Sequence, residues 1–366
     1  MPRQRLRELG IAIGRLEPGP HNAITDVPGV RVGHCTLVRD EPTVVRSGVT
    51  AVMPLEDHEI LADQLFAGIH SFNGRGEMTG IPWVEESGLL DSPILITNTS
   101  SVGVCRDAAV EWAVKRGASQ RFHLPVVAET FDGWLSDINS FSIAKEHAWA
   151  AMEAARSGPV AEGNVGGGTG MIAHEFKGGI GTASRRARLG EATYAVGALV
   201  QANYGARSML RCGGIPVGEL LGPDVTPLPW PKPRDAGSII VVLATDAPLL
   251  ADQCKRLARR ATTGLAWVGG YGTNGSGDIF IGFSTANRIP TSGPGDPLTP
   301  IAVQTLPSEA MSRLFLAAAE ATEEAILNAM CMAETMTGLE GRTVHALPLD
   351  RLREVMTRAR AALASA

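Results

Sequence analysis

The chain has 366 residues and a net charge of −5 at pH 7, with 44% hydrophobic and 19% charged residues. These values are typical of an ordinary globular protein, and they lack the basic excess that indicates a nucleic-acid partner. No apolar run is long enough to cross a bilayer, and the basic start is followed by an apolar stretch that Gly14 and Arg15 interrupt. We therefore expect a cytoplasmic protein without a membrane span or a signal peptide.

Short apolar runs between turn residues predict strands along the chain, at residues 50–53, 94–96, 125–127, 239–243 and 279–281. The run at 239–243 contains no polar residue, so we expect both of its faces to be covered. Helices are predicted at residues 107–114, 249–265 and 311–336. The last of these carries many alanines near one face, which favours close packing against a sheet.

Glycine and proline mark the connections between these elements. The chain contains 42 glycines, many of them in clusters, and two long segments rich in proline and glycine at 222–237 and 287–307. Strands and helices joined by many tight turns indicate a layered α/β architecture. The periodicity alone leaves open whether the sheets are open or stacked.

Residues that commonly hold metals or form disulfides are dispersed. The five cysteines form no C-x-x-C pair, and the eight histidines show no H-E-x-x-H spacing. The glycine-rich stretch at 166–170 lacks the lysine and the spacing of a phosphate-binding loop. We therefore expect neither a metal nor another cofactor.

A glycine run at 269–275 leads directly into Ser276, Gly277 and Asp278 at the start of an apolar strand. If the Ser276 hydroxyl attacks the Gly275 carbonyl, an N→O acyl shift makes an ester that water can cleave. The serine then carries a free α-amine, which is much less basic than lysine and can serve as general base for its own hydroxyl. By itself, the segment is also an ordinary turn sequence.

Seven segments, in order along the chain, extend this observation. They are residues 22–34, 73–80, 129–133, 163–171, 201–205, 274–278 and 321–325. Together they resemble the DmpA/BapA-type aminopeptidases, N-terminal-nucleophile hydrolases that include β-aminopeptidases and D-amino-acid amidases or esterases. The resemblance implies an αββα four-layer sandwich and one catalytic domain, 1–366, that self-cleaves into an α fragment 1–275 and a β fragment 276–366. It also implies a homotetramer of such units.

The resemblance assigns the oxyanion-stabilising groups. Asn203 matches the position whose side-chain amide donates to the oxyanion, a role that suits a neutral, preorganised donor. Phe131 lies where some relatives carry a tyrosine that assists this step, and phenylalanine has no hydroxyl to offer. The oxyanion hole would then depend on Asn203 and on backbone N–H groups, including that of Gly277. The alternative is that Asn203 is only a turn residue before Tyr204.

The resemblance also assigns two acidic positions. Glu129 matches the residue that holds the free amino group of a small peptide or amide substrate, and the alternative is an exposed glutamate at a strand end. Ser308 and Glu309 occupy the place before the last long helix where relatives carry a serine and a glutamate. Glu309 would orient or protonate Ser276. The alternative is that Ser308 and Glu309 belong to an ordinary helix start.

The leading function is therefore that of a self-processing serine aminopeptidase or amidase that releases L-, D- or β-amino acids from small peptides, amides or esters. A second hydrolase function is cleavage within oligomers of ω-amino-acid amides. Relatives of that kind tend to use threonine as the nucleophile, so Ser276 favours the first function. A third alternative is a family member that never cleaves itself and does not catalyse.

Overall fold

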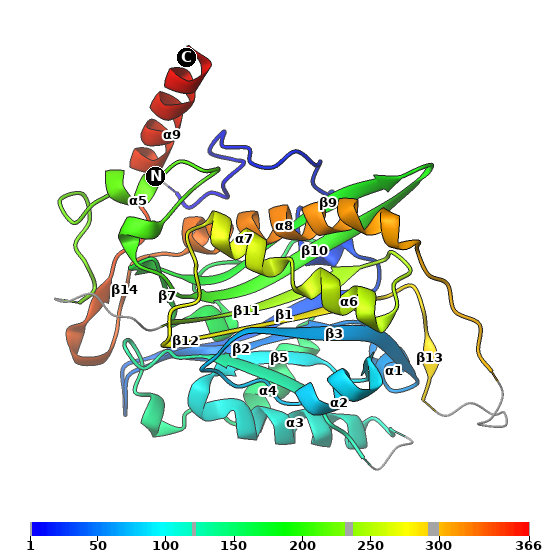
Figure 1. The fold of residues 1–366 in the computed structure, drawn as a ribbon. Helices are drawn as coiled ribbons and strands as arrows, with labels where there is room; N and C mark the ends of the chain where they lie inside the picture. The colour runs from blue at the N-terminus through cyan, green and yellow to red at the C-terminus, as the bar shows by residue number, and fades with distance from the viewer. Residues whose placement is uncertain (1, 119–121, 231–236, 292–299, 366) are drawn as a thin grey trace.

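Two β-sheets face one another, and helices cover the outer side of each (Figure 1). This arrangement is seen in a computed structural model that describes residues 2–118, 122–230, 237–291 and 300–365. The four layers confirm the αββα sandwich, and the stacked arrangement resolves what periodicity had left open. None of the helices in these described ranges is both long and apolar enough to cross a membrane.

The smaller sheet has the strand order β1-β2-β5-β6. Its strands are β1 (Arg31–Arg39), β2 (Val45–Met53), β5 (Ile94–Asn98) and β6 (Val126–Thr130). Only β5 and β6 pair in parallel, while β2 is antiparallel to both of its neighbours. Helices α3 (Val102–Lys115) and α4 (Lys145–Glu153) cover the outer face of this sheet (Figure 1).

The larger sheet has the order β13-β3-β12-β11-β10-β9, with β4 paired to β3. The bounds are β3 (Asp63–Gly74), β4 (Leu89–Leu90), β9 (Gly179–Leu189), β10 (Ala192–Asn203), β11 (Gly237–Thr245), β12 (Ser276–Ser284) and β13 (Ile289–Pro290). Strands β11 and β12 run parallel at its centre. Helices α6 (Ala251–Ala258), α7 (Ala261–Trp267) and α8 (Met311–Met332) cover its outer face (Figure 1).

Smaller elements complete the fold around the two sheets. Two short hairpins pair β7 (Ile172–Ala173) with β8 (Phe176–Lys177), and β14 (Met336–Thr337) with β15 (Thr343–Val344). The remaining helices are α1 (Asp57–Ile60), α2 (Ile81–Ser87), α5 (Val217–Leu220) and the C-terminal α9 (Leu349–Ala364). Helix α9 projects from one end of the sandwich (Figure 1).

Strand β11 shows how the core is divided. Ile239, Val241 and Leu243 pack in the cluster between the larger sheet and its helices. The intervening Ile240 and Val242 pack in the cluster that includes the facing sheet. Since successive side chains of a strand point to opposite faces, a run without polar residues is what a strand between two apolar layers requires. The prediction that this strand is covered on both faces is confirmed.

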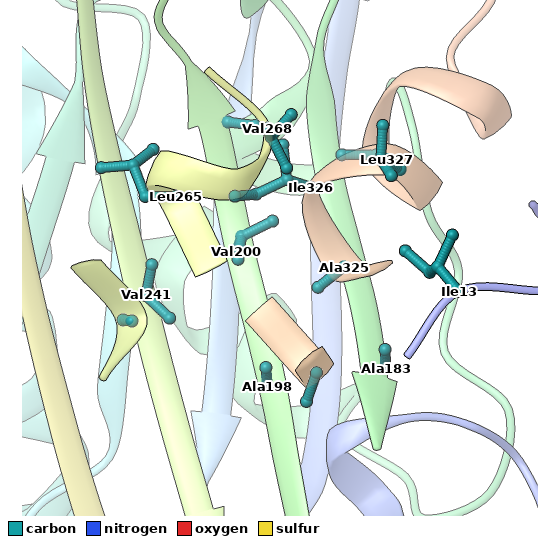
Figure 2. Packing of buried hydrophobic residues seen from close by; sticks show 14 of the residues in the cluster. Ile13, Ala183, Ala198, Val200, Val241, Leu265, Val268, Ala325, Ile326 and Leu327 are labelled. Carbon is teal, nitrogen blue, oxygen red and sulfur yellow. The ribbon is translucent and has the colours of Figure 1, made fainter. Parts of the chain in front are cut away.

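The outer core lies where the long helix meets the larger sheet. Figure 2 shows Ala325 and Ile326 of α8 and Leu265 of α7 packed over Val200 of β10 and Val241 of β11. Small residues let the helix approach closely: a Cβ at Gly181 of β9 would lie 2.0 Å from Ala325 O. The alanine-rich face predicted for this helix is therefore the face that packs on the sheet.

Two predicted helices differ from those observed. The single helix predicted at 249–265 is two helices, α6 and α7, because the chain turns at residues 259–260 so that α6 covers β3 and β12 while α7 packs against α8. The helix predicted at 311–336 ends at Met332, because Ala333 is extended (φ −73°, ψ 140°) and leads to strand β14.

A buried ionic cluster explains two of the segments used for the resemblance. Arg185 of β9 forms ion pairs with Glu320 at 3.0 Å and with Glu324 at 2.6 Å, and all three side chains are buried. Asn22 donates from Nδ2 to Glu324 Oε1 at 2.6 Å, and Arg7 also pairs with Glu324 at 2.8 Å. Asn22 and Glu324 thus help to fasten the N-terminal chain to α8 and β9.

Candidate active site

A cavity of about 590 Å³ opens at the end of the sandwich where β11 and β12 begin and where β6 and β10 end. Three of the predicted site side chains line it together with Gly275, although they come from distant parts of the chain. The lining residues are Arg75, Gly76, Glu77, Thr99, Glu129, Phe131, Trp134, Ile172, Asn203, Trp230, Gly237, Ser238 and Gly275.

Ser276 is the first residue of β12, directly after the cavity residue Gly275. With the peptide bond between them intact, the Ser276 N–H donates to Thr273 O at 2.9 Å, and its carbonyl accepts from Arg75 N at 3.2 Å. The side chain is only 3% exposed. Hydrogen bonds therefore hold both the backbone N–H and the backbone carbonyl of Ser276 in place.

Glycine is required next to the serine for a steric reason. A Cβ at Gly277 would lie 2.4 Å from Arg75 O and 2.6 Å from Gly76 Cα, so a larger residue would displace the segment that follows β3. In addition, Gly272 has φ +71°, a conformation that L side chains rarely adopt. The glycine-rich sequence thus permits a sharp turn and a close backbone approach at the start of β12.

Asp278 is the residue that the structure places beside the serine hydroxyl. Ser276 Oγ donates to Asp278 Oδ1 at 2.6 Å, and the Asp278 side chain is 1% exposed. Burial raises the pKa of the Asp278 carboxyl to about 6, against the opposing effect of hydrogen bonds from Ser276 and from the backbone at Ile239. This contact was not predicted from the sequence, although residues two apart in a strand share a face, which is the signal that could have indicated it.

Ser308 and Glu309 are not brought to the cavity. Both side chains are exposed, and Ser308 Oγ accepts from Arg256 Nη1 at 3.1 Å. The N–H of the nearby Leu306 donates a hydrogen bond to Pro248 O, which lies just beyond Thr245, the last residue of β11. Ser276 begins the nine-residue β12 at the opposite end, about 26 Å away along a strand. Asp278, and not Glu309, therefore lies beside Ser276. Ser308 and Glu309 begin the 3₁₀ turn that precedes α8, and Pro307 is its N-cap residue.

Asn203, the last residue of β10, holds its amide in a defined orientation. Its Oδ1 accepts from Ile172 N at 2.8 Å, and its Nδ2 donates to Phe131 O at 3.0 Å. Asn203 is in register with Ser238 of β11, which is in register with Gly277 of β12. Nδ2 carries a second hydrogen, for which the described residues provide no recorded acceptor, so the amide can donate to a ligand in the cavity.

The Gly277 N–H is already engaged in the uncleaved chain. It donates to Ser238 Oγ at 3.2 Å, and the Ser238 hydroxyl donates in turn to Gly237 O at 2.6 Å. Ser238 itself lines the cavity. The expected contribution of Gly277 to an oxyanion hole therefore requires this hydrogen bond to be exchanged for one to the substrate.

Glu129 lies on β6, in the smaller sheet, and its carboxylate reaches the same cavity. Oε1 accepts from Glu77 N at 3.0 Å, and Oε2 accepts from the Thr99 hydroxyl. Burial raises the pKa of the Glu129 carboxyl, although these hydrogen bonds act in the opposite direction. No lysine or arginine among the described residues forms an ion pair with it, so its charge is open to a cationic ligand group.

Phe131 adds an apolar wall to the cavity. Its ring is 50% exposed, which is high for a phenylalanine, and it lies one residue beyond the end of β6. Trp134 and Trp230 continue this wall with their rings edge to face at a centroid distance of 5.7 Å. Substrate groups next to the carboxylate of Glu129 would therefore meet aromatic surface.

The same fold is found in a related solved structure. An L-aminopeptidase D-Ala-esterase/amidase from Ochrobactrum anthropi is described as a prototype for the serine aminopeptidases and a variant of the N-terminal-nucleophile (Ntn) hydrolase fold. It superposes with a TM-score of 0.89 at 44% identity, covering 98% of this chain and 99% of the other. Fold and site together define an Ntn hydrolase.

The family follows from the sequence comparison. Residues 22–344 match the model of peptidase family S58, and the chain belongs to this family. A β-peptidyl aminopeptidase, BapA, of Sphingosinicella microcystinivorans is 47% identical over 97% of this chain and 92% of its own length. A Burkholderia sp. β-aminopeptidase superposes with a TM-score of 0.90 at 48% identity, covering 97% of this chain and 99% of the other. The resemblance to DmpA/BapA-type enzymes is confirmed, and the protein is a hydrolase of the aminopeptidase class.

Proposed function

We propose that the chain cleaves itself between Gly275 and Ser276, and that the new N-terminal serine then removes amino-terminal residues from small peptides or amides. The observation that supports this most directly is the shared cavity. It is lined by Gly275, the residue directly before Ser276, by the amide donor Asn203 and by Glu129, whose carboxylate pairs with no described lysine or arginine. The backbone just before Ser276, the Asn203 amide and the Glu129 carboxylate suit the proposed attack by Ser276, the oxyanion and the substrate amine, respectively.

Each residue has a defined part in the proposed reaction. The substrate ammonium binds Glu129, which places the first amide carbonyl near Ser276. The Ser276 hydroxyl attacks this carbonyl while its own α-amine takes the proton, and the Asn203 amide donates to the developing oxyanion. The α-amine then protonates the leaving group. Water attacks the resulting ester, the first residue leaves, and the free serine is restored.

The substrate class is proposed from the relatives together with the cavity. Two relatives, 47% and 41% identical, are β-peptidyl aminopeptidases, and a third is an L-aminopeptidase D-Ala-esterase/amidase. We infer that β-amino acids with apolar or aromatic side chains are accepted, because Phe131 and two tryptophans line the cavity. Assembly as a cytoplasmic homotetramer of processed units is part of the same proposal.

Self-cleavage is tested on the purified wild-type protein. Denaturing electrophoresis is expected to show two bands, with serine as the first residue of the smaller one. Activity toward p-nitroanilides of L-, D- and β-amino acids should rise as the full-length band disappears. A single full-length band with constant activity after long incubation would contradict the proposed maturation.

Replacing Glu129 by glutamine is expected to weaken binding of substrates with free amines. The amide oxygen can still accept from Glu77 N–H and the NH2 can donate to the Thr99 hydroxyl oxygen, but the side chain loses the charge-assisted bond to the ammonium, worth about 1.5–3 kcal/mol. The fall in kcat/KM should therefore be roughly 10- to 150-fold, mostly through KM.

The control for this variant is Glu86→Gln, the same change on an exposed residue of α2. It should retain the wild-type kcat/KM. N-acetylated p-nitroanilides provide the second comparison, because they carry no ammonium for Glu129. If the wild-type enzyme cleaves N-acetylated and free substrates equally well, Glu129 does not hold the amine.

A further inference from the structure

Before cleavage, Ser276 cannot use its own nitrogen as a base. That nitrogen is part of the Gly275–Ser276 amide, and its N–H donates to Thr273 O at 2.9 Å. An amide nitrogen has no basic lone pair with which to accept the hydroxyl proton. The step that frees the amine therefore needs a different base from the reactions that follow it. This inference rests on the proposed self-cleavage.

One group in the structure is placed to accept that proton. Asp278 Oδ1 accepts a hydrogen bond from Ser276 Oγ at 2.6 Å, and the serine and aspartate side chains are 3% and 1% exposed. Such burial excludes bulk water from the hydroxyl. Tyr204 also lies near, with a buried hydroxyl whose pKa is raised by burial and by the negative charge of Asp278. A neutral tyrosine hydroxyl is not a base.

The strand geometry keeps Asp278 in this position. Residues 276 and 278 lie on the same face of β12, and β12 is hydrogen-bonded to β11 on one side and to β3 on the other. The register with β3 shifts between Asp278 and Ile279, so the first residues of β12 are offset from the rest of the ladder. Pairing with β11 at Ser276 and Asp278, and with β3 at Asp278, therefore fixes the backbone that carries the serine–aspartate pair.

We propose that Asp278 is the catalytic base of autoprocessing: its carboxylate takes the Ser276 hydroxyl proton as Oγ attacks the Gly275 carbonyl carbon. The C–N bond to Ser276 then breaks, and the proton passes from Asp278 to the departing nitrogen. This leaves an ester, a neutral amine and the original carboxylate. Water next cleaves the ester, giving the Gly275 carboxylate and the free hydroxyl, and the released proton passes to the new amine, with one water consumed in total.

The chemical environment of Asp278 suits this role. Because burial raises the pKa of the carboxyl to about 6, the group is mostly ionised at neutral pH and is more basic than an ordinary aspartate. No lysine or arginine pairs with it among the residues that the structure describes. Its proton affinity is therefore available to the serine hydroxyl.

The test compares the rates at which full-length variants mature. Asp278→Asn can still accept a hydrogen bond from Oγ but cannot take its proton, so maturation should slow at least 100-fold. The double variant Ser276→Cys with Asp278→Asn should recover at least 10-fold of this loss, because a thiol ionises far more readily than a hydroxyl and depends less on a base. Asp252→Asn, the same change on an exposed residue of α6, should mature at the wild-type rate.

Hydroxylamine locates the blocked step, since it cleaves esters but not amides. Asp278→Asn should release no fragments when hydroxylamine is added, because the ester has not formed. Three results would each overturn the proposal. Asp278→Asn could mature at the wild-type rate, hydroxylamine could readily release its fragments, or the cysteine double variant could mature as slowly as Asp278→Asn. If Asp278→Asn does not melt cooperatively as Ser276→Ala does, Asp278→Ser replaces it. Failure of both to fold would show a structural role and also overturn the proposal.

Two outcomes distinguish a failure of the proposed function from a failure of the Asp278 assignment alone. If Ser276→Ala matures normally, self-cleavage through Ser276 is wrong and the role of Asp278 is lost with it. If Ser276→Ala stays intact while Asp278→Asn matures at the wild-type rate, the proposed function stands and only the assignment of the base fails.

Discussion

Ser276→Ala is expected to remain a single chain of 366 residues and to lose amidase activity by on the order of 10⁴-fold or more. The loss is large because one hydroxyl serves twice, first to attack the Gly275 carbonyl and later to attack the substrate. Without the first attack the α-amine is never freed, so the variant lacks both nucleophile and base. Denaturing electrophoresis and p-nitroanilide turnover measure the two losses separately.

Ser284→Ala is the matched control, since Ser284 is the last residue of the same strand and its hydroxyl donates to Ala247 O at 2.6 Å. This variant can lose some thermal stability, but it should mature and turn over substrate at the wild-type rate. Normal cleavage of Ser276→Ala after Gly275 would show that another group performs maturation, and Ser276 would lose its proposed role.

Asn203→Asp is expected to lower kcat by about 10²–10³-fold, which is the effect of removing one oxyanion donor. The change is nearly isosteric, and Oδ1 can still accept from Ile172 N, which holds the side chain in the native structure. The donor Nδ2 is replaced by an oxygen that repels both Phe131 O and the developing oxyanion. Single-turnover kinetics on protein that has already matured isolate this effect on chemistry.

Asn164 provides a matched control for this amide-to-carboxylate change. Like Asn203, it donates to a backbone carbonyl and accepts from a backbone N–H, in this case both of Glu334, at 2.9 and 3.1 Å. Asn164→Asp should therefore report the general cost of the substitution without affecting the cavity. Equal reductions of kcat in the two variants would mean that Asn203 does not act on the oxyanion.

Local sequence patterns predicted the elements that are uniformly apolar because they are buried on all sides. The run at 239–243 lies between two apolar layers, so its composition alone identified a strand covered on both faces. Strands β3 and β10 were not predicted, because glycine and polar residues interrupt their apolar pattern. Their stability comes from pairing with neighbours: β10 pairs with β9 and β11, and β3 pairs with β12 about 200 residues further along the chain.

The site residues also differ in whether local sequence or only the tertiary structure indicates them. The glycine run and the strand after it drew attention to Ser276 from local sequence, because a glycine turn before an apolar strand is a local pattern, and the resemblance then assigned it as the nucleophile. Asn203 and Glu129 were assigned through resemblance, and the structure places both at one cavity. Glu309 was expected beside Ser276 from its order in the chain, but it lies at the other end of the larger sheet.

The amino-acid sequence by itself therefore predicted the layered class of fold and, through family likeness, the hydrolase chemistry and Ser276 as the proposed nucleophile. Only the tertiary structure decided which carboxylate meets the serine hydroxyl: Asp278, two residues away on the same face of β12. It also decided that Glu129 of one sheet and Asn203 of the other share a cavity. The physical reason is that a strand's position is set by pairing with distant strands and by apolar burial between layers, and neither is encoded in neighbouring residues.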